Sequence, residues 1–411
     1  TRDCNLLVSA AAGSGKTAVL VERIISMVMG KYGNEPVDID NLLVVTFTRA
    51  AAGEMRERVL KALEEASIKE PSNEHLRKQT TYIHNAKIAT IDSFCHDIVR
   101  EYFSDIDLDP GFKIGDTGEL KLMQSDAIGK VLEESYQAGD KDFFRFIDEY
   151  SSSKSDSDVE EAILTLYNFA SSYPNPKKWL NNLCHMYEEE NAKQWLDIIV
   201  DNLKEQLLEC QRSVNMAFEL SNLPAFDKYL KLFGEEKAYI AQMLETDEFD
   251  RLGRLVKAMD FARMPIVKGL SGEDELVKKR ISSLRDGYKK TIKKLATKYF
   301  GRSYEDIVKD VTDCYPLVKV LVDLTLKFME EYKSIKSDKD ILDFSDIEHY
   351  ALEILVKEDE EGNYVPTETA LAISKDFYEI MIDEYQDSNL VQEIILNAIA
   401  GRGVNASNIF M

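Results

Sequence analysis

Apolar and polar residues follow one pattern near the two ends of the chain and another in its middle. Near the beginning, short apolar or β-branched runs occupy 6–9, 42–46 and 87–91, and residues at helical spacing follow each run. After about residue 341 the same alternation returns, with an apolar strand predicted over 379–383. Short runs that alternate with helices are typical of βαβ units, so we expect a parallel sheet with helices on its faces.

The middle of the chain, from about residue 112 to 340, carries almost no strand pattern. Its apolar residues recur at helical spacing among Lys and Glu, over 119–136, 158–170, 193–220 and 274–299. Pro and Gly residues interrupt these segments. The sequence therefore predicts an all-α region between two α/β segments.

Composition narrows the class of protein. Of 411 residues, 44% are hydrophobic and 30% are charged, which is ordinary for a globular protein with a large core. No apolar run approaches the ~20 residues that span a bilayer, so we expect no membrane segment. The five cysteines have no C-x-x-C spacing, which argues against a disulfide framework or a zinc site and favours a reducing cytoplasm. A net charge of -23 argues against a polyanionic partner for the chain as a whole.

The candidate chemistry starts directly after the first apolar run. Residues 9–17 read Ser-Ala-Ala-Ala-Gly-Ser-Gly-Lys-Thr, and a strand that leads through a Gly-rich turn into a helix is the architecture of a phosphate-binding loop. Glycines let backbone N–H groups point at a phosphate, and the following helix adds its positive end. Lys16 would reach the β/γ-phosphates, and the Thr17 hydroxyl would bind Mg²⁺. The residues predicted to hold a nucleoside triphosphate are Ala10, Ala11, Ala12, Gly13, Ser14, Gly15, Lys16 and Thr17.

A second candidate site follows the predicted strand 379–383. Asp383-Glu384-Tyr385-Gln386-Asp387 would lie at the carboxyl end of that strand, where open α/β sheets bind ligands. Asp383 can hold Mg²⁺, and Glu384 can orient or deprotonate an attacking water. Taken alone, an acidic pair here fits a helix N-cap about as well. Asp383 comes 367 positions after Lys16, far more than one nucleotide-binding core needs. Residues 112–341 are therefore predicted to be a helical insertion between core segments 1–111 and 342–411.

Two more predicted strands end in residues suited to single-stranded nucleic acid. The candidate residues around their carboxyl ends are Phe47, Thr48, Arg49, Thr90, Ser93 and Phe94. Aromatic rings can stack on bases, while hydroxyl and basic groups hold phosphates. Core positions at strand ends account for Phe47 and Phe94 equally well.

The order of these motifs resembles that of the UvrD/Rep-like superfamily 1 DNA helicases. Ala-Gly-Ser-Gly-Lys-Thr, Val-Thr-Phe-Thr-Arg-Ala-Ala, Thr-Ile-Asp-Ser-Phe and Asp-Glu-Tyr-Gln-Asp match motifs I, Ia, Ib and II of that family in sequence order. Residues 9–24, 108–112 and 342–347 are more similar to the AddA chains of the AddAB (RexAB) helicase–nucleases. The likeness covers both α/β segments well and the helical region loosely.

The resemblance implies a fold, a reaction and partners. The fold would be α/β, a RecA-like P-loop sheet core (subdomain 1A) split by a large all-α insertion (subdomain 1B). The reaction would be ATP-dependent 3′→5′ DNA unwinding in double-strand-break repair and recombination, with ATP and Mg²⁺ as cofactors. The partners would be single-stranded DNA, a duplex end and an AddB/RexB-like second subunit in a heterodimer.

The resemblance also implies residue roles. Lys16, Asp383, Glu384 and Gln386 would be catalytic, with Gln386 coupling the γ-phosphate to the DNA site, and Thr17 and Asp383 would hold Mg²⁺. Phe47, Thr48, Arg49, Thr90, Ser93 and Phe94 would lie along the single strand. Three positions depart from the family pattern: Ala10 replaces the first Gly, Arg49 replaces Asn, and Asp92 replaces a frequent His. An acid at position 92 would repel phosphates.

One segment is basic within this acidic chain. Residues 254–302 hold 14 Lys/Arg and 5 Asp/Glu. Because the corresponding helical insertion of the helicase–nucleases can contact duplex, the resemblance implies duplex contacts at Lys279, Arg280, Lys290 and Lys294. An ordinary solvated helix face explains the charge equally well.

The chain begins at Thr1 and ends at Met411 within an apolar run, so we expect a fragment of a longer protein. The resemblance would place a second motor domain and a nuclease domain beyond it, and the fragment alone should then bind nucleotide without hydrolysing it. Two other functions stay open: a stand-alone UvrD/PcrA-type repair helicase, and a nucleotide-gated, non-catalytic DNA-binding module. The intact Lys16, Thr17, Asp383 and Glu384 argue against the second.

Overall fold

The computed structural model describes residues 5–8, 15–31, 35–151, 155–401 and 408–411. The chain divides into two compact units. The first consists of Thr1–Gly139, Ser151–Trp179 and Leu324–Met411, and the second of Asp140–Tyr150 and Leu180–Asp323. Only part of the segment 112–341 therefore forms a separate compact unit, because its two flanks pack with the α/β residues.

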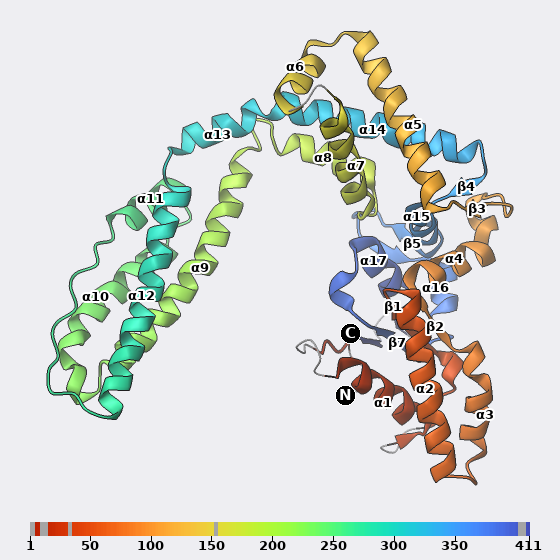
Figure 1. The fold of residues 1–411 in the computed structure, drawn as a ribbon, viewed down its shortest axis with the longest axis horizontal. Coiled ribbons are helices and arrows are strands. Elements are labelled where there is room, and N and C mark those ends of the chain that lie inside the picture. Colours follow the sequence, from red (N-terminus) through yellow and green to blue (C-terminus); the bar gives the residue numbers. More distant parts are fainter. Residues whose placement is uncertain (1–4, 9–14, 32–34, 152–154, 402–407) are drawn as a thin grey trace. The chain divides into compact units, whose positions relative to one another are not determined.

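A parallel sheet lies at the centre of the first unit (Figure 1). Its strands are β1 (Leu42–Thr46), β2 (Lys87–Thr90), β7 (Glu379–Ile382) and β8 (Ile409–Phe410), in the spatial order β2-β1-β7-β8. All the pairings are parallel, with Val44 opposite both Ile88 and Met381. Residues 6–9, predicted as a strand, contribute a parallel bridge from Leu6 to Phe410. The Val8 amide also donates to the Met411 carbonyl at 2.7 Å, so this segment lies beside β8.

Alternate strand residues point to opposite faces of the sheet, and each face has its own hydrophobic core. Leu43, Val45 and Ile380 contribute to the core that includes α4, α15, α16 and α17. Leu42, Val44 and Met381 contribute to the core that includes α1, α2 and α3. Both faces of the parallel sheet are therefore covered, which explains why its strands read as continuous apolar runs.

Helices make up most of the first unit, so it is mostly helical around a parallel sheet core. Its helices are α1 (Lys16–Val28), α2 (Arg49–Lys69), α3 (Glu74–Tyr82), α4 (Ile91–Tyr102), α5 (Thr117–Ala138), α7 (Ser157–Ser171), α15 (Phe344–Leu355), α16 (Glu368–Ile373) and α17 (Leu390–Ala398). Its single 3₁₀ turns are Ile39–Asn41, Ile83–Asn85, Phe103–Ile106 and Tyr385–Asp387. Two helices, α8 (Pro176–His185) and α14 (Tyr315–Ser337), have residues in both units.

Two further strand pairs complete the first unit. Strand β3 (Lys113–Ile114) pairs in parallel with β4 (Ile341–Leu342), and β5 (Val356–Glu358) pairs antiparallel with β6 (Tyr364–Pro366). The β3–β4 pair holds residues 113 and 341 side by side. The chain therefore leaves the α/β part and returns to it at adjacent points, close to the bounds predicted for the insertion.

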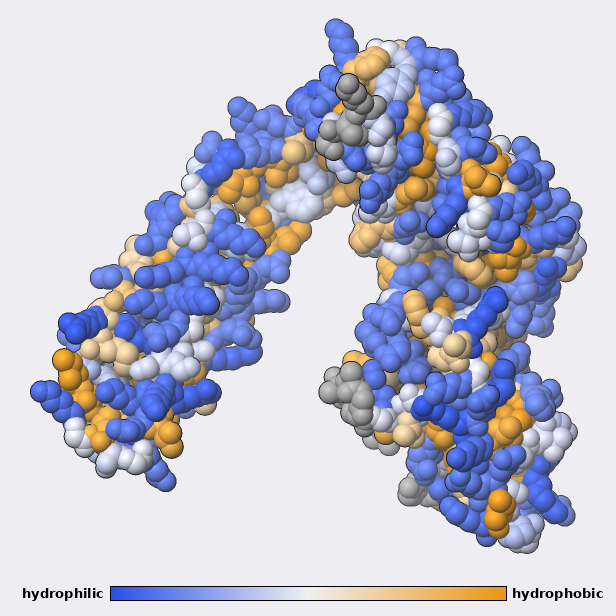
Figure 2. Space-filling view, in the orientation of Figure 1, coloured by the Kyte–Doolittle hydropathy of each residue, from blue (hydrophilic) through white to orange (hydrophobic). Residues whose placement is uncertain are grey.

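The second unit is helical in all of its described residues that have regular structure. Its elements are α6 (Lys141–Tyr150), α9 (Lys193–Leu220), a 3₁₀ turn (Pro224–Tyr229), α10 (Leu230–Leu244), α11 (Phe249–Ala258), α12 (Glu273–Tyr299) and α13 (Tyr304–Asp313). Its core is built from buried residues of α9 to α12. Figure 2 shows that hydrophilic residues predominate on the visible outer face of these helices.

A buried ion pair lies inside the second unit. The Arg285 guanidinium of α12 contacts the Glu236 carboxylate of α10 through Nε, at 3.1 and 3.2 Å from its two oxygens, and through an NH₂ group. The Tyr288 hydroxyl donates to the same carboxylate. Arg285 also donates to the Ala262 carbonyl at 2.7 Å, which attaches the extended segment before α12. Burial and the Glu236 carboxylate raise the pKa of Tyr288, so it stays a neutral donor.

In the described part of the chain, no helix is both long enough and apolar enough to cross a membrane.

Candidate functional site

The carboxyl ends of β1, β2 and β7 meet at one edge of the sheet, because the strands are parallel and in register. Thr46 lies opposite Thr90, and Val45 opposite Ile382. The Asp383 amide donates to the Val45 carbonyl at 2.9 Å, which extends the β7 pairing by one residue. Residues that come from positions 46, 90 and 383 in the sequence are thereby gathered in one place, as expected for a ligand site of an open α/β sheet.

The start of α1 lies at the same edge. Residues 6–8 run beside β8, and Lys16 opens α1 after Gly15, whose φ of 92° is a conformation that favours glycine. The predicted phosphate-binding residues Ala10, Ala11, Ala12, Gly13 and Ser14 lie outside the described residues. Thr17, the predicted Mg²⁺ ligand, is in the first turn of α1 and is partly exposed.

Three predicted catalytic residues contact one another. The Lys16 ammonium lies 3.0 Å from Oε2 of Glu384, and the Gln386 side-chain amide donates to the same oxygen. These two contacts hold the pKa of Glu384 below its usual range, so its carboxylate is ionised at neutral pH. Glu384 itself has a left-handed backbone (φ 60°, ψ 45°), which turns the chain sharply after β7. Left-handed backbone at a non-Gly residue costs free energy and is concentrated at functional sites.

Asp383 lies in a different environment from its neighbour. It is half-buried, and burial together with the Glu384 charge raises its pKa, while Lys16 and Arg58 oppose the shift. A divalent cation would stabilise the ionised form and remove the repulsion between the two acids. The donor set fits such a cation: a carboxylate at a strand end with the Thr17 hydroxyl in the first turn of α1. Sequence reasoning gave no sign of Arg58, which approaches from α2.

A pocket of about 370 Å³ adjoins these groups. Its polar wall is made by Lys16, Asp383, Glu384 and Gln386, which are all four of the predicted catalytic residues. Its other wall is apolar and lined by Leu7, Val8, Val19, Leu20, Ile382, Tyr385, Phe410 and Met411. A concave site with an apolar wall and a few converging charged groups is the usual form of a small-molecule site.

The predicted DNA residues of the two other strands fall into different settings. The Phe47 side chain is 57% exposed, so its ring is free of the core, and Arg49 is exposed beside it. Thr48 and Thr90 are the N-caps of α2 and α4, because their hydroxyls accept from the amides of Ala51 and Ser93. Thr90 is also buried, and its hydroxyl bonds that of Ser93 at 2.9 Å. The threonines therefore shape the edge as helix caps.

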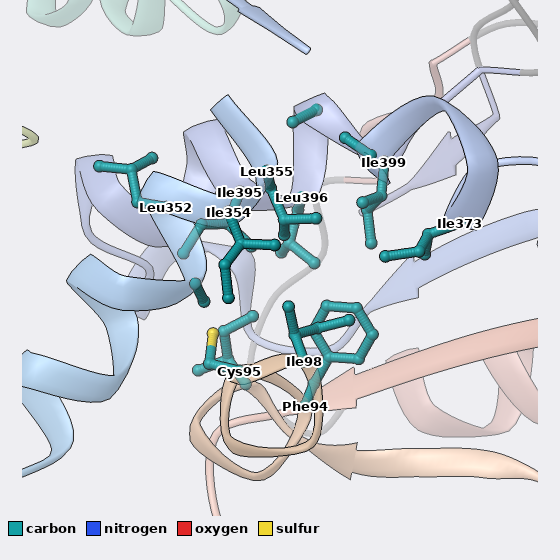
Figure 3. Close-up of a cluster of buried hydrophobic side chains, with 14 of the residues drawn as sticks. Phe94, Cys95, Ile98, Leu352, Ile354, Leu355, Ile373, Ile395, Leu396 and Ile399 are labelled. Atoms are coloured by element: carbon teal, nitrogen blue, oxygen red, sulfur yellow. The ribbon is translucent and has the colours of Figure 1, made fainter. Parts of the chain in front are cut away.

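The expectation that Phe94 lies along a nucleic acid is corrected by the structure. Its side chain is only 5% exposed and packs edge-to-face against Phe377, with ring centroids 6.4 Å apart. Figure 3 shows Phe94 with Cys95 and Ile98 of α4 facing apolar residues of α15 and α17. The ring is part of the core, because position 94 falls on the inward face of α4. No face of it is open to a base.

Sequence reasoning missed a buried acid near this edge. Glu348 of α15 is 6% exposed and interacts with Asp92, the residue that departs from the family pattern. Arg49 lies close enough to Asp92 to lower the pKa of that carboxyl, against the upward effect of burial. A single Glu within an amphipathic helix reads as a solvent-facing residue, so the sequence carried no signal for it.

The predicted duplex contacts lie in the second unit. Lys279, Arg280, Lys290 and Lys294 are exposed on α12. Other basic residues of the segment 254–302 have structural partners: Arg285 is buried against Glu236, Arg302 pairs with Asp310, and Lys289 lies 5.4 Å from the centre of the Phe261 ring. The free positive charge is thus smaller than the composition indicates.

Comparisons with known proteins agree with this arrangement. The UvrD/REP helicase N-terminal domain family matches residues 2–411. The chain is 43% identical to the AddA-type chain of the ATP-dependent helicase/nuclease of Lachnoclostridium phytofermentans over 422 residues, which cover 100% of the chain and 30% of the relative. It is 42% identical to the corresponding protein of a Thermoanaerobacter species and 37% identical to that of Bacillus velezensis. Those alignments cover 100% and 99% of this chain, and 34% and 33% of the relatives. The chain spans about a third of the length of the curated relatives it matches.

Proposed function

This chain belongs to the UvrD/REP helicase N-terminal domain family, and we propose that it is the first motor part of an AddA-type ATP-dependent DNA helicase/nuclease. The observation that carries the proposal is the cluster of Lys16, Glu384 and Gln386 beside Asp383 at one pocket. These residues are about 370 positions apart in the chain, yet they form one site with the charges that phosphoryl transfer to water requires.

Each residue of this site has a proposed task. Lys16 neutralises charge on the β/γ-phosphates of ATP, and residues 10–15 would supply backbone amides to them. Thr17 and Asp383 hold Mg²⁺, which supplies further charge neutralisation when bound. Glu384 orients and deprotonates the attacking water, a role that its ionised carboxylate suits. Gln386 contacts Glu384 and is placed to relay the state of that carboxylate.

The DNA is proposed to lie along the edge where β1 and β2 end. The exposed Phe47 ring supports stacking on a base, and the exposed Arg49 side chain and the Ser93 hydroxyl support contacts to phosphates. We infer that the sheet and its helices correspond to subdomain 1A of a RecA-like core and the helical region to subdomain 1B. The partners would be a duplex end and an AddB/RexB-like protein. Double-strand-break repair would be the setting.

The proposal is tested by DNA-stimulated ATP hydrolysis and by unwinding of a 3′-tailed duplex, using the full-length protein with its AddB/RexB-like partner. If the protein is a helicase, it should hydrolyse ATP faster with single-stranded DNA and separate the strands. A non-catalytic, nucleotide-gated DNA-binding module would bind both ligands with no turnover, and that result would overturn the proposal. Residues 1–411 alone are proposed to bind nucleotide without hydrolysing it, because the arginine fingers of this superfamily come from a second motor domain.

Exposed lysines of α12 give a separate prediction about duplex binding. If Lys279, Lys290 and Lys294 contact phosphates, replacing all three by Glu should flatten the salt dependence of duplex binding by about three contacts, each worth about 0.9 log units per log unit of salt. The measurement is duplex affinity against salt concentration. A matched control with the same charge change is the replacement of the exposed Lys193, Lys228 and Lys231 by Glu. Equal slopes for the wild type and the α12 variant would identify α12 as an ordinary solvated face.

A further inference from the structure

The start of α17 is fixed by side chains that use both ends of their amide groups. Asn389 and Gln392 form a capping box, in which the Asn389 carbonyl oxygen accepts from the Gln392 amide at 2.8 Å and the Gln392 carbonyl oxygen accepts from the Asn389 amide at 3.3 Å. Their NH₂ groups then both donate to Glu348, at 2.6 Å from Gln392 and 3.3 Å from Asn389. Glu348 is therefore the common acceptor that holds the first turn of α17 to α15.

Glu348 also faces Asp92, in the first turn of α4. A hydrogen bond links the two side chains, and two carboxyl groups can share one only when one of them carries a proton. Burial raises the pKa of Glu348 against the effect of its amide donors, and burial likewise raises the pKa of Asp92. The other charged or titratable groups near the pair are Arg49 at the start of α2, Cys95 on α4 and His349 on α15.

This pair lies between two regions that the proposed function requires to communicate. Helix α4 begins directly after β2, at the edge proposed to bind single-stranded DNA, and Arg49 reaches Asp92 from the same edge. Helix α17 begins only two residues after Asp387, the last residue of the loop that carries Asp383, Glu384 and Gln386. Helices α4, α15 and α17 share one hydrophobic core, so the three elements are firmly packed (Figure 3).

We propose that Asp92 and Glu348 are positioning residues that hold one proton between them and thereby connect the DNA edge to the ATP-site loop through the start of α17. The inference rests on the proposed function. A phosphate near Arg49 competes with Asp92 for the guanidinium, which changes the charge balance of the pair. Because Glu348 is the acceptor for Asn389 and Gln392, any shift of its proton changes the hydrogen bonds that set the start of α17.

The effect of pH has a definite sign. A carboxyl group whose pKa is raised by folding stabilises the protein least when it is ionised, so the contribution of the pair is lost as pH rises through its folded pKa values. Glu348→Gln offers an N–H donor toward Asp92 and keeps a carbonyl acceptor for α17 with no proton to lose. The variant should therefore resemble the protonated wild type at every pH.

The experiment measures ATP hydrolysis by the full-length protein with its AddB/RexB-like partner, with and without single-stranded DNA, as a function of pH. Glu348→Ala should lower the ratio of stimulated to unstimulated rates by about tenfold, a typical size for coupling between sites, with the unstimulated rate retained. The ratio for the wild type should fall as pH rises, whereas the ratio for Glu348→Gln should stay flat. Asp92→Asn should flatten the profile as well, which covers the case in which Glu348→Ala does not fold.

Two exposed acids on the same helices provide matched controls. Glu353→Gln on α15 and Asp97→Asn on α4 should keep the wild-type ratio and its pH profile. The proposal is overturned if Glu348→Gln follows the wild-type pH profile, or if a folded Glu348→Ala keeps the wild-type ratio. A wild-type protein with no stimulation by DNA would instead contradict the proposed function, so the two failures are distinguishable.

Discussion

Replacing Glu384 by Gln should reduce DNA-stimulated ATP hydrolysis by about 10²-fold or more while ATP binding is retained. The carboxylate contacts Lys16 and Gln386, and these contacts lower its pKa, so it is the ionised base of the site. Glutamine has the same shape and can still accept from Lys16, but it cannot take a proton from water. The measurement is a coupled ATPase assay on the full-length protein with saturating DNA, beside equilibrium nucleotide binding.

Two further variants define what that loss means. Lys16→Ala removes the cation that would face the phosphates, so it should weaken nucleotide binding as well as hydrolysis. Glu22→Gln changes an exposed acid on the same helix α1 and should leave both quantities unchanged. Turnover of Glu384→Gln at close to the wild-type rate would show that another group activates the water.

Replacing Arg285 by Ala should destabilise the second unit by about 3 to 5 kcal/mol, the usual cost of leaving one partner of a buried ion pair without the other. Arg285 and Glu236 side chains are 7% and 5% exposed, so water cannot solvate the carboxylate that is left behind. The same change removes the bond to the Ala262 carbonyl, which attaches the segment before α12. The loss should therefore affect α10, α12 and that segment together.

Hydrogen exchange of the amides of α9 to α12, followed against denaturant, measures this free energy for the second unit alone. Arg254→Ala, which truncates an exposed arginine of α11, is the control. Removing both charges, as in Glu236→Leu with Arg285→Met, should recover much of the stability, because no buried charge is then unpaired. A cost for Arg285→Ala of less than about 1 kcal/mol, as for an exposed pair, would contradict the prediction.

The fold could be predicted from the sequence where the period of the apolar residues was unambiguous. The predicted strand 42–46 coincides with β1, and the predicted helix 193–220 coincides with α9. The pairs β3–β4 and β5–β6 went unpredicted, because strands of two or three residues are too short to show a period. The bounds of the compact units were also beyond the sequence, since packing of α5 and α7 with the α/β residues depends on tertiary contacts.

The candidate site could be predicted as far as its residues lie in motifs with fixed spacing. Lys16, Asp383, Glu384 and Gln386 line one pocket in the structure, although their roles stay predictions. Phe94 could not be told from an exposed aromatic, because position 94 gives no indication of which face of α4 turns to the core. Glu348 stayed hidden for the opposite reason, since burial of a charged residue is decided by the partners that surround it.

The side-by-side position of residues 6 and 410 has a consequence for the order in which this protein can assemble during synthesis. Strand β1 pairs with β7, about 335 residues later, and the segment before the phosphate-binding loop is held by β8, so the sheet and the nucleotide site cannot form until residue 410 has left the ribosome. At about 5 to 20 residues per second, β1 waits on the order of 20 to 70 s for those partners. The core of α9 to α12 comes from consecutive residues and can fold during that time. A nascent chain with an unpaired apolar strand is prone to aggregate, so this protein should depend on chaperones that bind β1 until synthesis reaches β8.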